Sequence, residues 1–244
     1  MKCYVLFFLI FISCTRDALN SCFIGNGKLK TETRKLSPFS IIQINGRMRI
    51  TVLSDSLNYI ELQAGENVIP YIKTKVENTT LHLDYLARCA VIKGYKEIPE
   101  LKIHVKALNQ IQHYGSEPLQ IVYSKPNDTL RVYSEGSGDI EFNGLVYQLH
   151  LSIHGFLSAR LFGSCKRCNF WMSGSAYIYA STFNVSDFLF VDSYAVAHAY
   201  CLATPTQFFS CNLHDLGNIY LYGKPNTIQN YSNSNNSGKL MYMP

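Results

Sequence analysis

Apolar and polar residues recur with a period of 19 residues in the second half of the chain. A short turn followed by a strand-like segment repeats there, and each copy has a small or apolar residue at its centre. The centres are separated by 19, 19, 19 and 22 residues and are Ile140, Ala159, Ile178, Ala197 and Ile219. A fixed period near 20 residues is typical of a solenoid, in which each repeat forms one coil stacked on the last.

Three further positions in each repeat are almost always apolar: two residues after the centre, six before it and eight before it. They are Phe142, Leu161, Ala180, Ala199 and Leu221; Ser134, Ile153, Met172, Val191 and Leu213; and Val132, Leu151, Phe170, Leu189 and Cys211. Residues two apart in a strand share a face, so we expect these columns to point inward from two short strands that flank a turn. The pattern predicts an all-β fold, a parallel β-helix with coils of about 19 residues. An α-solenoid would need longer repeats and a 3.6-residue period.

The outward positions of the same repeats are rich in aromatic residues. As candidate ligand-binding residues we take Tyr133, Trp171, Tyr177, Tyr179, Phe190, Tyr194, Tyr220 and Tyr222. Flat aromatic side chains on a rigid sheet can stack on sugars or anchor a protein partner. The alternative is that they are ordinary strand residues, because tyrosine favours strands.

The first half of the chain is also β-like but irregular. Alternating apolar residues such as Leu101, Ile103 and Val105 predict strands, yet the 19-residue register is absent. We expect residues 34–124 to form an N-terminal β section that caps or leads into the solenoid, because an open end would expose unpaired strand edges. A boundary is expected at 125–128, with the solenoid and its C-terminal cap in 125–244.

The N-terminus resembles a bacterial lipoprotein signal. Residues 1–13 contain Lys2 and a short apolar run that ends before Cys14, which would become the lipidated first residue and join the protein to a membrane. An ordinary signal peptide cut nearby is the alternative. The polar residues 14–33 are expected to form a tether.

Charge and cysteine content narrow the function classes. The net charge is only +5 and the basic residues are scattered, which argues against a nucleic-acid partner. An exported chain permits disulfides, and the cysteines left after processing are Cys22, Cys89, Cys165, Cys168, Cys201 and Cys211. Cys165 and Cys168 have CxxC spacing, but we expect them in a loop between coils, as a small disulfide or two free thiols, rather than in a redox site. The spacing favours no metal site, and we expect no cofactor.

Several motifs resemble those of one family. Arg34, Leu36, Phe39 and Ile42 fit its opening pattern, residues 136–140 form a Gly-Ser-Gly-Asp-Ile turn, and residues 220–225 approximate its closing Tyr-x-Gly-x-Pro. The chain therefore resembles the putative auto-transporter adhesin, head GIN domain family of exported bacterial proteins, common in Bacteroidota. The resemblance implies a right-handed β-helix, a cell-envelope location and no established catalytic residues. Together with the lipoprotein signal at Cys14, we expect a lipid anchor in the outer membrane.

Three functions remain open at this stage. The first is a non-enzymatic, adhesin-like envelope lipoprotein that binds a glycan or a protein through the aromatic residues. The second is a β-helical enzyme acting on polysaccharides, whose candidate residues are Glu135, Asp139, His154, Ser173, Asp192, His214 and Asp215. The regular repeat leaves little room for the loop insertions that would wall such an active site, so we predict no catalytic residues. The third is a purely structural role in envelope assembly.

Overall fold

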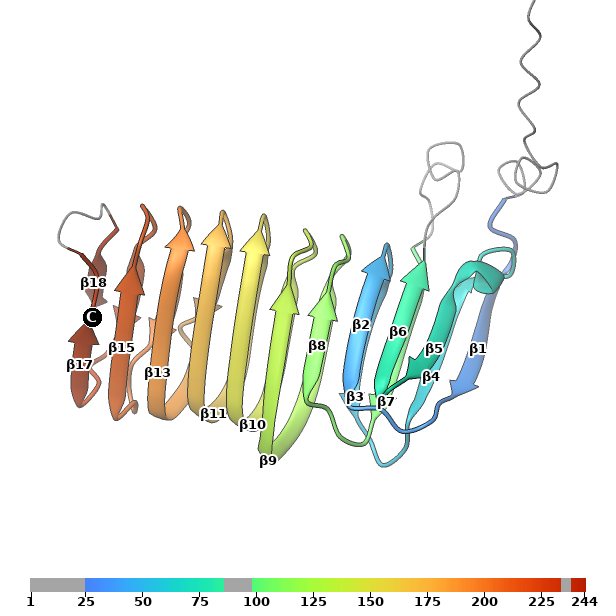
Figure 1. Ribbon diagram of the computed structural model, residues 1–244, viewed down its shortest axis with the longest axis horizontal. Coiled ribbons are helices and arrows are strands. Elements are labelled where there is room, and N and C mark those ends of the chain that lie inside the picture. The colour runs from blue at the N-terminus through green and yellow to red at the C-terminus, as the bar shows by residue number, and fades with distance from the viewer. Residues whose placement is uncertain (1–24, 86–97, 234–237) are drawn as a thin grey trace, which may run out of the picture.

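The computed structural model describes residues 25–85, 98–233 and 238–244. These residues form a β-solenoid of about six turns (Figure 1), which confirms the predicted fold class. One short 3-10 turn, Ile69–Tyr71, interrupts the strands. No helix in the described part of the chain is long and apolar enough to cross a bilayer. Cys14 lies outside the described residues.

The strands fall into a capping section and a long stack. In the N-terminal part they are β1 (Leu29–Lys35), β2 (Ile41–Gly46), β3 (Arg49–Ser54), β4 (Tyr59–Gly65), β5 (Lys73–Glu77), β6 (Thr80–Tyr85), β7 (Glu100–Val105) and β8 (Gln110–His113). The stack continues with β9 (Leu119–Ser134), β10 (Ile140–Gly155), β11 (Ser158–Gly174), β12 (Tyr177–Ala180), β13 (Phe183–Ala195), β14 (Ala199–Leu202), β15 (Phe208–Leu213), β16 (Ile219–Tyr222), β17 (Thr227–Asn230) and β18 (Leu240–Met243).

Each coil presents two sides to solvent. The long strands β9, β10 and β11 bend within their length (Figure 1), so that their two halves lie on different sides of the coil. Side 1 consists of the first halves of these strands together with β12, β14, β16 and β18. Side 2 consists of their second halves together with β13, β15 and β17. A tight corner joins side 2 of one coil to side 1 of the next.

The parallel register corrects the repeat read from the sequence. The residues that stack at the centre of side 1 are Leu119, Ile140, Ala159, Ile178, Ala199, Ile219 and Leu240. The predicted fourth centre, Ala197, was therefore wrong by two residues. The shift arises in two steps of one residue each. One extra residue lies between Tyr179 and Phe183, and the second lies in β13 opposite the irregularity between Cys165 and Arg167.

A shift of two residues keeps every side chain on its original face, because the side-chain period of a strand is two. The predicted inward columns are consequently all buried, although each of the four changes neighbours across the shift. On side 2, Trp171 lies beside Asp192 rather than Phe190. The prediction of burial was right, and the prediction of which outward residues are neighbours was partly wrong.

The N-terminal section both continues and caps the solenoid. β2 pairs in parallel with β6 and with β8, so the second strand of the chain lies between two later ones. β3 is placed in the same way between β7 and β9. At the far end, β4 runs antiparallel to β7 and to β1, and β5 runs antiparallel to β6, which covers the parallel edges.

Two expected boundaries fall inside strands. Residues 125–128 lie within β9, whose parallel pairing with β10 continues on both sides of a local irregularity. β1 begins at Leu29, within the segment expected to be a tether, because its backbone pairs with β4. In the C-terminal tail, β17 and β18 add one more coil by pairing with β15 and β16.

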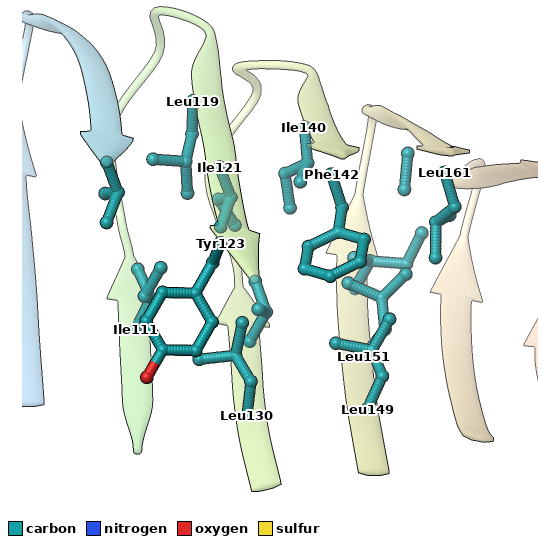
Figure 2. Packing of buried hydrophobic residues seen from close by; sticks show 14 of the residues in the cluster. Ile111, Leu119, Ile121, Tyr123, Leu130, Ile140, Phe142, Leu149, Leu151 and Leu161 are labelled. Atoms are coloured by element: carbon teal, nitrogen blue, oxygen red, sulfur yellow. The ribbon is translucent and has the colours of Figure 1, made fainter. Parts of the chain in front are cut away.

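The core is a continuous column of apolar side chains between the two sides (Figure 2). Fully burying one such side chain contributes about 1.5–3 kcal/mol. Tyr123 is the largest polar exception, and its hydroxyl accepts a hydrogen bond from the Leu108 N–H at 3.0 Å and donates one to Asp128 at 2.6 Å. The buried Tyr123 hydroxyl therefore has hydrogen-bond partners as both acceptor and donor.

The corners depend on small residues that let one coil lie directly on the next. A Cβ atom on Gly136 would lie 2.0 Å from the carbonyl oxygen of Gly115 in the neighbouring coil. In the same corner, the Asp139 carboxylate accepts a hydrogen bond from the Ser158 N–H at 2.8 Å. The Gly-Ser-Gly-Asp turn is thus a stacking element.

The CxxC motif does not lie in a loop between coils, as we expected. Cys165 and Cys168 lie within β11, and both are free and buried, as are Cys201 and Cys211. Burial is the main cause that raises the pKa of Cys168, assisted by its hydrogen bond with Cys165, and burial raises the pKa of Cys211 to about 12. These thiols pack as small hydrophobic side chains.

Replacing Gly136 with Ala is expected to destabilise the fold by about 1–3 kcal/mol, because the added methyl group meets backbone and not a movable side chain. Urea unfolding followed by circular dichroism measures this. The neighbouring exposed residue serves as the control, and Ser137→Ala should stay within about 0.5 kcal/mol of the wild type. Equal stability of both variants would contradict the close approach at the corner.

The four core thiols are expected to resist alkylation in the native protein, because all four are buried away from the reagent. In addition, the raised pKa of Cys168, Cys201 and Cys211 leaves them almost no thiolate. Peptide mapping by mass spectrometry after iodoacetamide treatment should show Cys168 and Cys201 labelled only in urea. Rapid labelling of either residue without denaturant would contradict their placement in the core.

Candidate functional site

The eight predicted aromatic residues do not form one patch. On side 2 lie Tyr133, Trp171, Phe190 and Tyr194, and on side 1 lie Tyr177, Tyr179, Tyr220 and Tyr222. The corner that joins the two sides separates the groups. Each group therefore has to be considered as a surface of its own.

Side 1 presents a column of stacked tyrosines, here called the tyrosine ladder, formed by Tyr179, Tyr200 and Tyr220. The ring centroids of Tyr179 and Tyr200 are 5.3 Å apart with an interplanar angle of 6°, and those of Tyr200 and Tyr220 are 5.0 Å apart at 10°. The parallel register places the three residues in successive coils. Each ring face inside the ladder is therefore covered by its neighbour.

The ends and flanks of the ladder are also occupied. Arg160 lies over the outer face of Tyr179, with its guanidinium carbon 5.5 Å from the ring centroid, and bonds Asp139 at 3.3 Å. Tyr177 stacks beside Tyr179 at 5.9 Å. Burial, followed by the neighbouring tyrosines, raises the pKa of Tyr200. The ladder thus presents edges of stacked rings to solvent rather than free aromatic faces.

His198 packs against the tyrosine ladder on the side nearest the corner. Its ring meets Tyr220 edge-on at 5.5 Å, and its Nδ1 accepts a hydrogen bond from the Asn218 N–H at 3.0 Å. The Asn218 side-chain amide in turn lies 3.4 Å from the Tyr220 hydroxyl. These contacts indicate a structural role for most of side 1.

Side 2 is hollowed beside Trp171. The depression, here called the Trp171 hollow, has a volume of about 240 Å³. Its lining consists of His150, Leu151, Ser152, Asn169, Phe170, Trp171, Phe190 and Asp192. Trp171 is 51% exposed, so it offers a large aromatic surface to solvent on this side.

Strand alternation and parallel register build the hollow from three coils. His150, Asn169 and Phe190 form one outward column across β10, β11 and β13. Ser152, Trp171 and Asp192 form the next column, two residues further along the same strands. The small side chains above and below Trp171 leave its ring unstacked within its own column.

His154 holds Trp171 from the corner side. The two rings meet edge-on with centroids 5.7 Å apart. The imidazole lies between two hydroxyl groups, with Nε2 2.9 Å from Ser152 Oγ and Nδ1 2.7 Å from Ser173 Oγ. Burial lowers the pKa of His154, against a smaller opposing effect of Glu135, so the imidazole is neutral near pH 7.

One polar atom in the hollow has no hydrogen-bond partner, whereas its neighbours do. The Asn169 amide nitrogen donates to Nδ1 of His150 at 3.1 Å, which leaves the proton of a neutral His150 on Nε2. The Asn169 Oδ1 atom is buried and has no hydrogen-bond partner among the described residues. A buried acceptor of this kind is normally satisfied by water or by a ligand.

Asp192 closes the other wall of the hollow. One of its carboxylate oxygens lies 2.9 Å from Nε2 of His214, and the His214 ring stacks on Tyr194 with centroids 3.8 Å apart. Asp192 and His214, two of the candidate catalytic residues, are therefore in contact, although they belong to adjacent columns.

The other candidate catalytic carboxylates are engaged elsewhere. Asp139 bonds Ser158 and Arg160, Asp215 accepts a hydrogen bond from the Leu216 N–H at 2.8 Å, and Glu135 accepts one from Tyr133. No cluster of three metal-ligating side chains occurs in the described ranges. The hollow therefore combines an aromatic platform with hydrogen-bonding groups and suits binding better than acid–base catalysis.

Sequence analysis missed three residues that define these surfaces. Tyr200 was not predicted as a neighbour of Tyr179 and Tyr220, because the 19-residue period places His198 at that position. His150 and Asn169 lie nine residues before the repeat centres Ala159 and Ile178, at a position whose members share no residue type. These residues are identified by the pairing of strands between coils and not by the composition of the sequence.

Comparison with known protein structures supports the fold. A putative adhesin from Bacteroides fragilis NCTC 9343 is 19% identical over 88% of this chain and 97% of its own, with a TM-score of 0.73. A putative adhesin from Parabacteroides distasonis ATCC 8503 is 17% identical over 90% and 98%, with a TM-score of 0.61. A protein described as a putative lipid binding protein from the same organism is 21% identical over the same shares, also with a TM-score of 0.61.

At these identities the solved structures establish a common fold and nothing about ligands. A comparison with proteins of curated function finds no match. The family model described as "Putative auto-transporter adhesin, head GIN domain" matches residues 38–225, which include the strands from β2 to β16 and both candidate surfaces. The chain belongs to the head GIN domain family of putative auto-transporter adhesins.

Proposed function

We propose that this chain is a non-enzymatic, adhesin-like protein of the cell envelope that binds a carbohydrate at the Trp171 hollow. Membership of an adhesin family indicates an extracellular or envelope protein and a role other than catalysis. The finer assignment to a carbohydrate depends on one observation. Trp171 is a half-exposed indole whose ring is not stacked within its column, next to hydrogen-bonding groups.

The chemistry of the hollow matches a sugar ring in two respects. The indole offers a flat apolar surface to the C–H face of a pyranose, while the polar wall offers acceptors at Asn169 and Asp192 and a donor at His150. A sugar hydroxyl can both donate and accept, so it can satisfy the unpartnered Asn169 Oδ1. The small volume favours one or two sugar units over a protein loop.

The tyrosine ladder is a weaker candidate for the same role. Its ring faces are covered by one another and by Arg160, so they are not available for stacking on a sugar. Among the eight predicted aromatic residues, we therefore assign binding to Trp171, with Phe190 as part of the wall, and structural packing to Tyr179 and Tyr220.

We further propose that Cys14 is lipidated and holds the solenoid at the outer membrane through the polar segment before β1. The support is the apolar run that ends at Cys14 and the absence of a membrane-spanning helix in the described ranges. An anchored elongated solenoid would present side 2 along its length to a carbohydrate of the envelope or of a neighbouring cell.

Trp171→Ala is expected to weaken carbohydrate binding at least about tenfold, because loss of a stacked aromatic face and its buried area removes more than 1.4 kcal/mol. An array of neutral bacterial and mucin-type oligosaccharides, followed by titration calorimetry on the best binders, measures this. Tyr179→Leu on side 1 is the matched control and should bind like the wild type. Binding that survives Trp171→Ala unchanged, or no binding to any oligosaccharide by the folded protein, would overturn the proposal.

Cys14→Ser is expected to move the protein from the membrane to the soluble fraction of the cells that produce it, because a serine cannot carry the lipid. Fractionation with detection of the intact chain measures this, and Cys22→Ser should leave the protein in the membrane fraction. If Cys22→Ser and not Cys14→Ser releases the protein, the anchor lies at the second cysteine instead.

A further inference from the structure

A second depression lies at the capped end of the solenoid, remote in sequence from the Trp171 hollow. It is here called the N-terminal pocket and has a volume of about 620 Å³, within the range of small-molecule sites. It forms where β1 ends, where the loop between β3 and β4 turns, and just beyond β7. Its lining consists of Thr33, Lys35, Leu36, Pro38, Ser56, Leu57, Asn58, Tyr59 and Lys106.

The pocket is electropositive and rich in hydrogen-bond donors. Lys35 and Lys106 are its charged residues, and neither forms an ion pair among the residues that the structure describes. The Asn58 Oδ1 atom already accepts a hydrogen bond from the Lys106 N–H at 2.9 Å, so the group that Asn58 can offer to a ligand is its amide NH2, a donor. A lining with two ammonium groups and no carboxylate attracts an anion.

The carboxylate of Asp55, which precedes Ser56 of the pocket lining, is engaged by contacts of its own. Asp55 accepts hydrogen bonds from the Ser56 N–H at 2.5 Å and from the Tyr59 hydroxyl at 3.4 Å, and it lies 2.8 Å from Nδ1 of His104. The Ser56 hydrogen bond, followed by that of His104, lowers the pKa of Asp55 to about 2. Asp55 is therefore charged at neutral pH but turned toward His104, so it offsets only part of the field of the two lysines.

One wall of the pocket is apolar. Leu36, Pro38 and Leu57 line it, and Leu57 is 67% exposed although it lies beside a concave surface. An inorganic ion would leave this wall in contact with water, whereas an apolar group on the ligand would cover it. The pocket thus joins an anion site to an apolar surface.

We propose that the N-terminal pocket binds a small organic anion, a carboxylate or phosphate that carries a short apolar chain. Lys35 and Lys106 contact the anionic group from the ends of β1 and β7, and the apolar chain lies against Leu36, Pro38 and Leu57. The site is independent of carbohydrate binding at Trp171, because the two hollows share no residue.

Calorimetric titration of the full chain with octanoate and with octyl phosphate tests the proposal, and the two probes distinguish the carboxylate source from the phosphate source. At least one should bind about tenfold or more tightly than acetate or inorganic phosphate, because only the octyl probes cover the apolar wall. Octyltrimethylammonium, with the same chain and the opposite charge, should not bind. Equal binding of the cation, or no binding of either anion, would overturn the proposal.

Charge-reversal variants locate the site. Lys35→Glu with Lys106→Glu should lose at least about tenfold in affinity for the octyl anion, whereas Lys30→Glu with Lys73→Glu, which make the same change in net charge outside the pocket, should lose much less. The alanine pair Lys35→Ala and Lys106→Ala replaces the first variant if circular dichroism shows that it does not fold. Trp171→Ala should bind the anion like the wild type, so a failure here and a failure at the Trp171 hollow are distinguishable. Equal losses in both lysine pairs would show non-specific charge attraction and overturn the assignment.

Discussion

Backbone hydrogen bonding between successive coils is the constraint on which the structure depends. Each coil pairs in parallel with the next at about 4.8 Å, so every residue lies directly above a counterpart from the neighbouring coil. Inward positions must then be apolar in coil after coil, and the corners must be small enough for one backbone to lie on another. Gly136 above Gly115 shows how little space remains there.

The same constraint decides which aromatic residues can bind anything. Tyr200 has a tyrosine on each side in its column, and the spacing of the coils is close to the distance at which aromatic rings stack, so its faces are covered. Trp171 lies between Ser152 and Asp192 in its own column, and these side chains are too small or too polar to cover an indole. An exposed aromatic residue on a solenoid is therefore available to a ligand when its counterparts in adjacent coils are small.

The repeat and the burial pattern were predictable from the sequence, although the coils are about 21 residues apart and not 19. The neighbours of each outward residue were only partly predictable. Alternation assigns a face to each residue, and a two-residue shift at β13 leaves that assignment unchanged. The same shift places Asp192 beside Trp171, where the 19-residue period predicted Phe190, and it places Tyr200 in the tyrosine ladder. No local signal in the sequence marks such an insertion, because it depends on how the backbone accommodates an irregularity in the pairing of β11 with β13.

The N-terminal half was less predictable because its order in space differs from its order in the chain. β2 lies between β6 and β8, so no repeat of fixed length relates it to its neighbours. The irregularity has a consequence for function. A uniform coil presents flat columns. The two hollows described above lie where the columns are interrupted, by small residues around Trp171 and by the antiparallel strands that replace parallel coils at the cap. Binding sites on this solenoid are therefore expected where its repeat is broken, which is why both hollows contain residues that the 19-residue period does not identify.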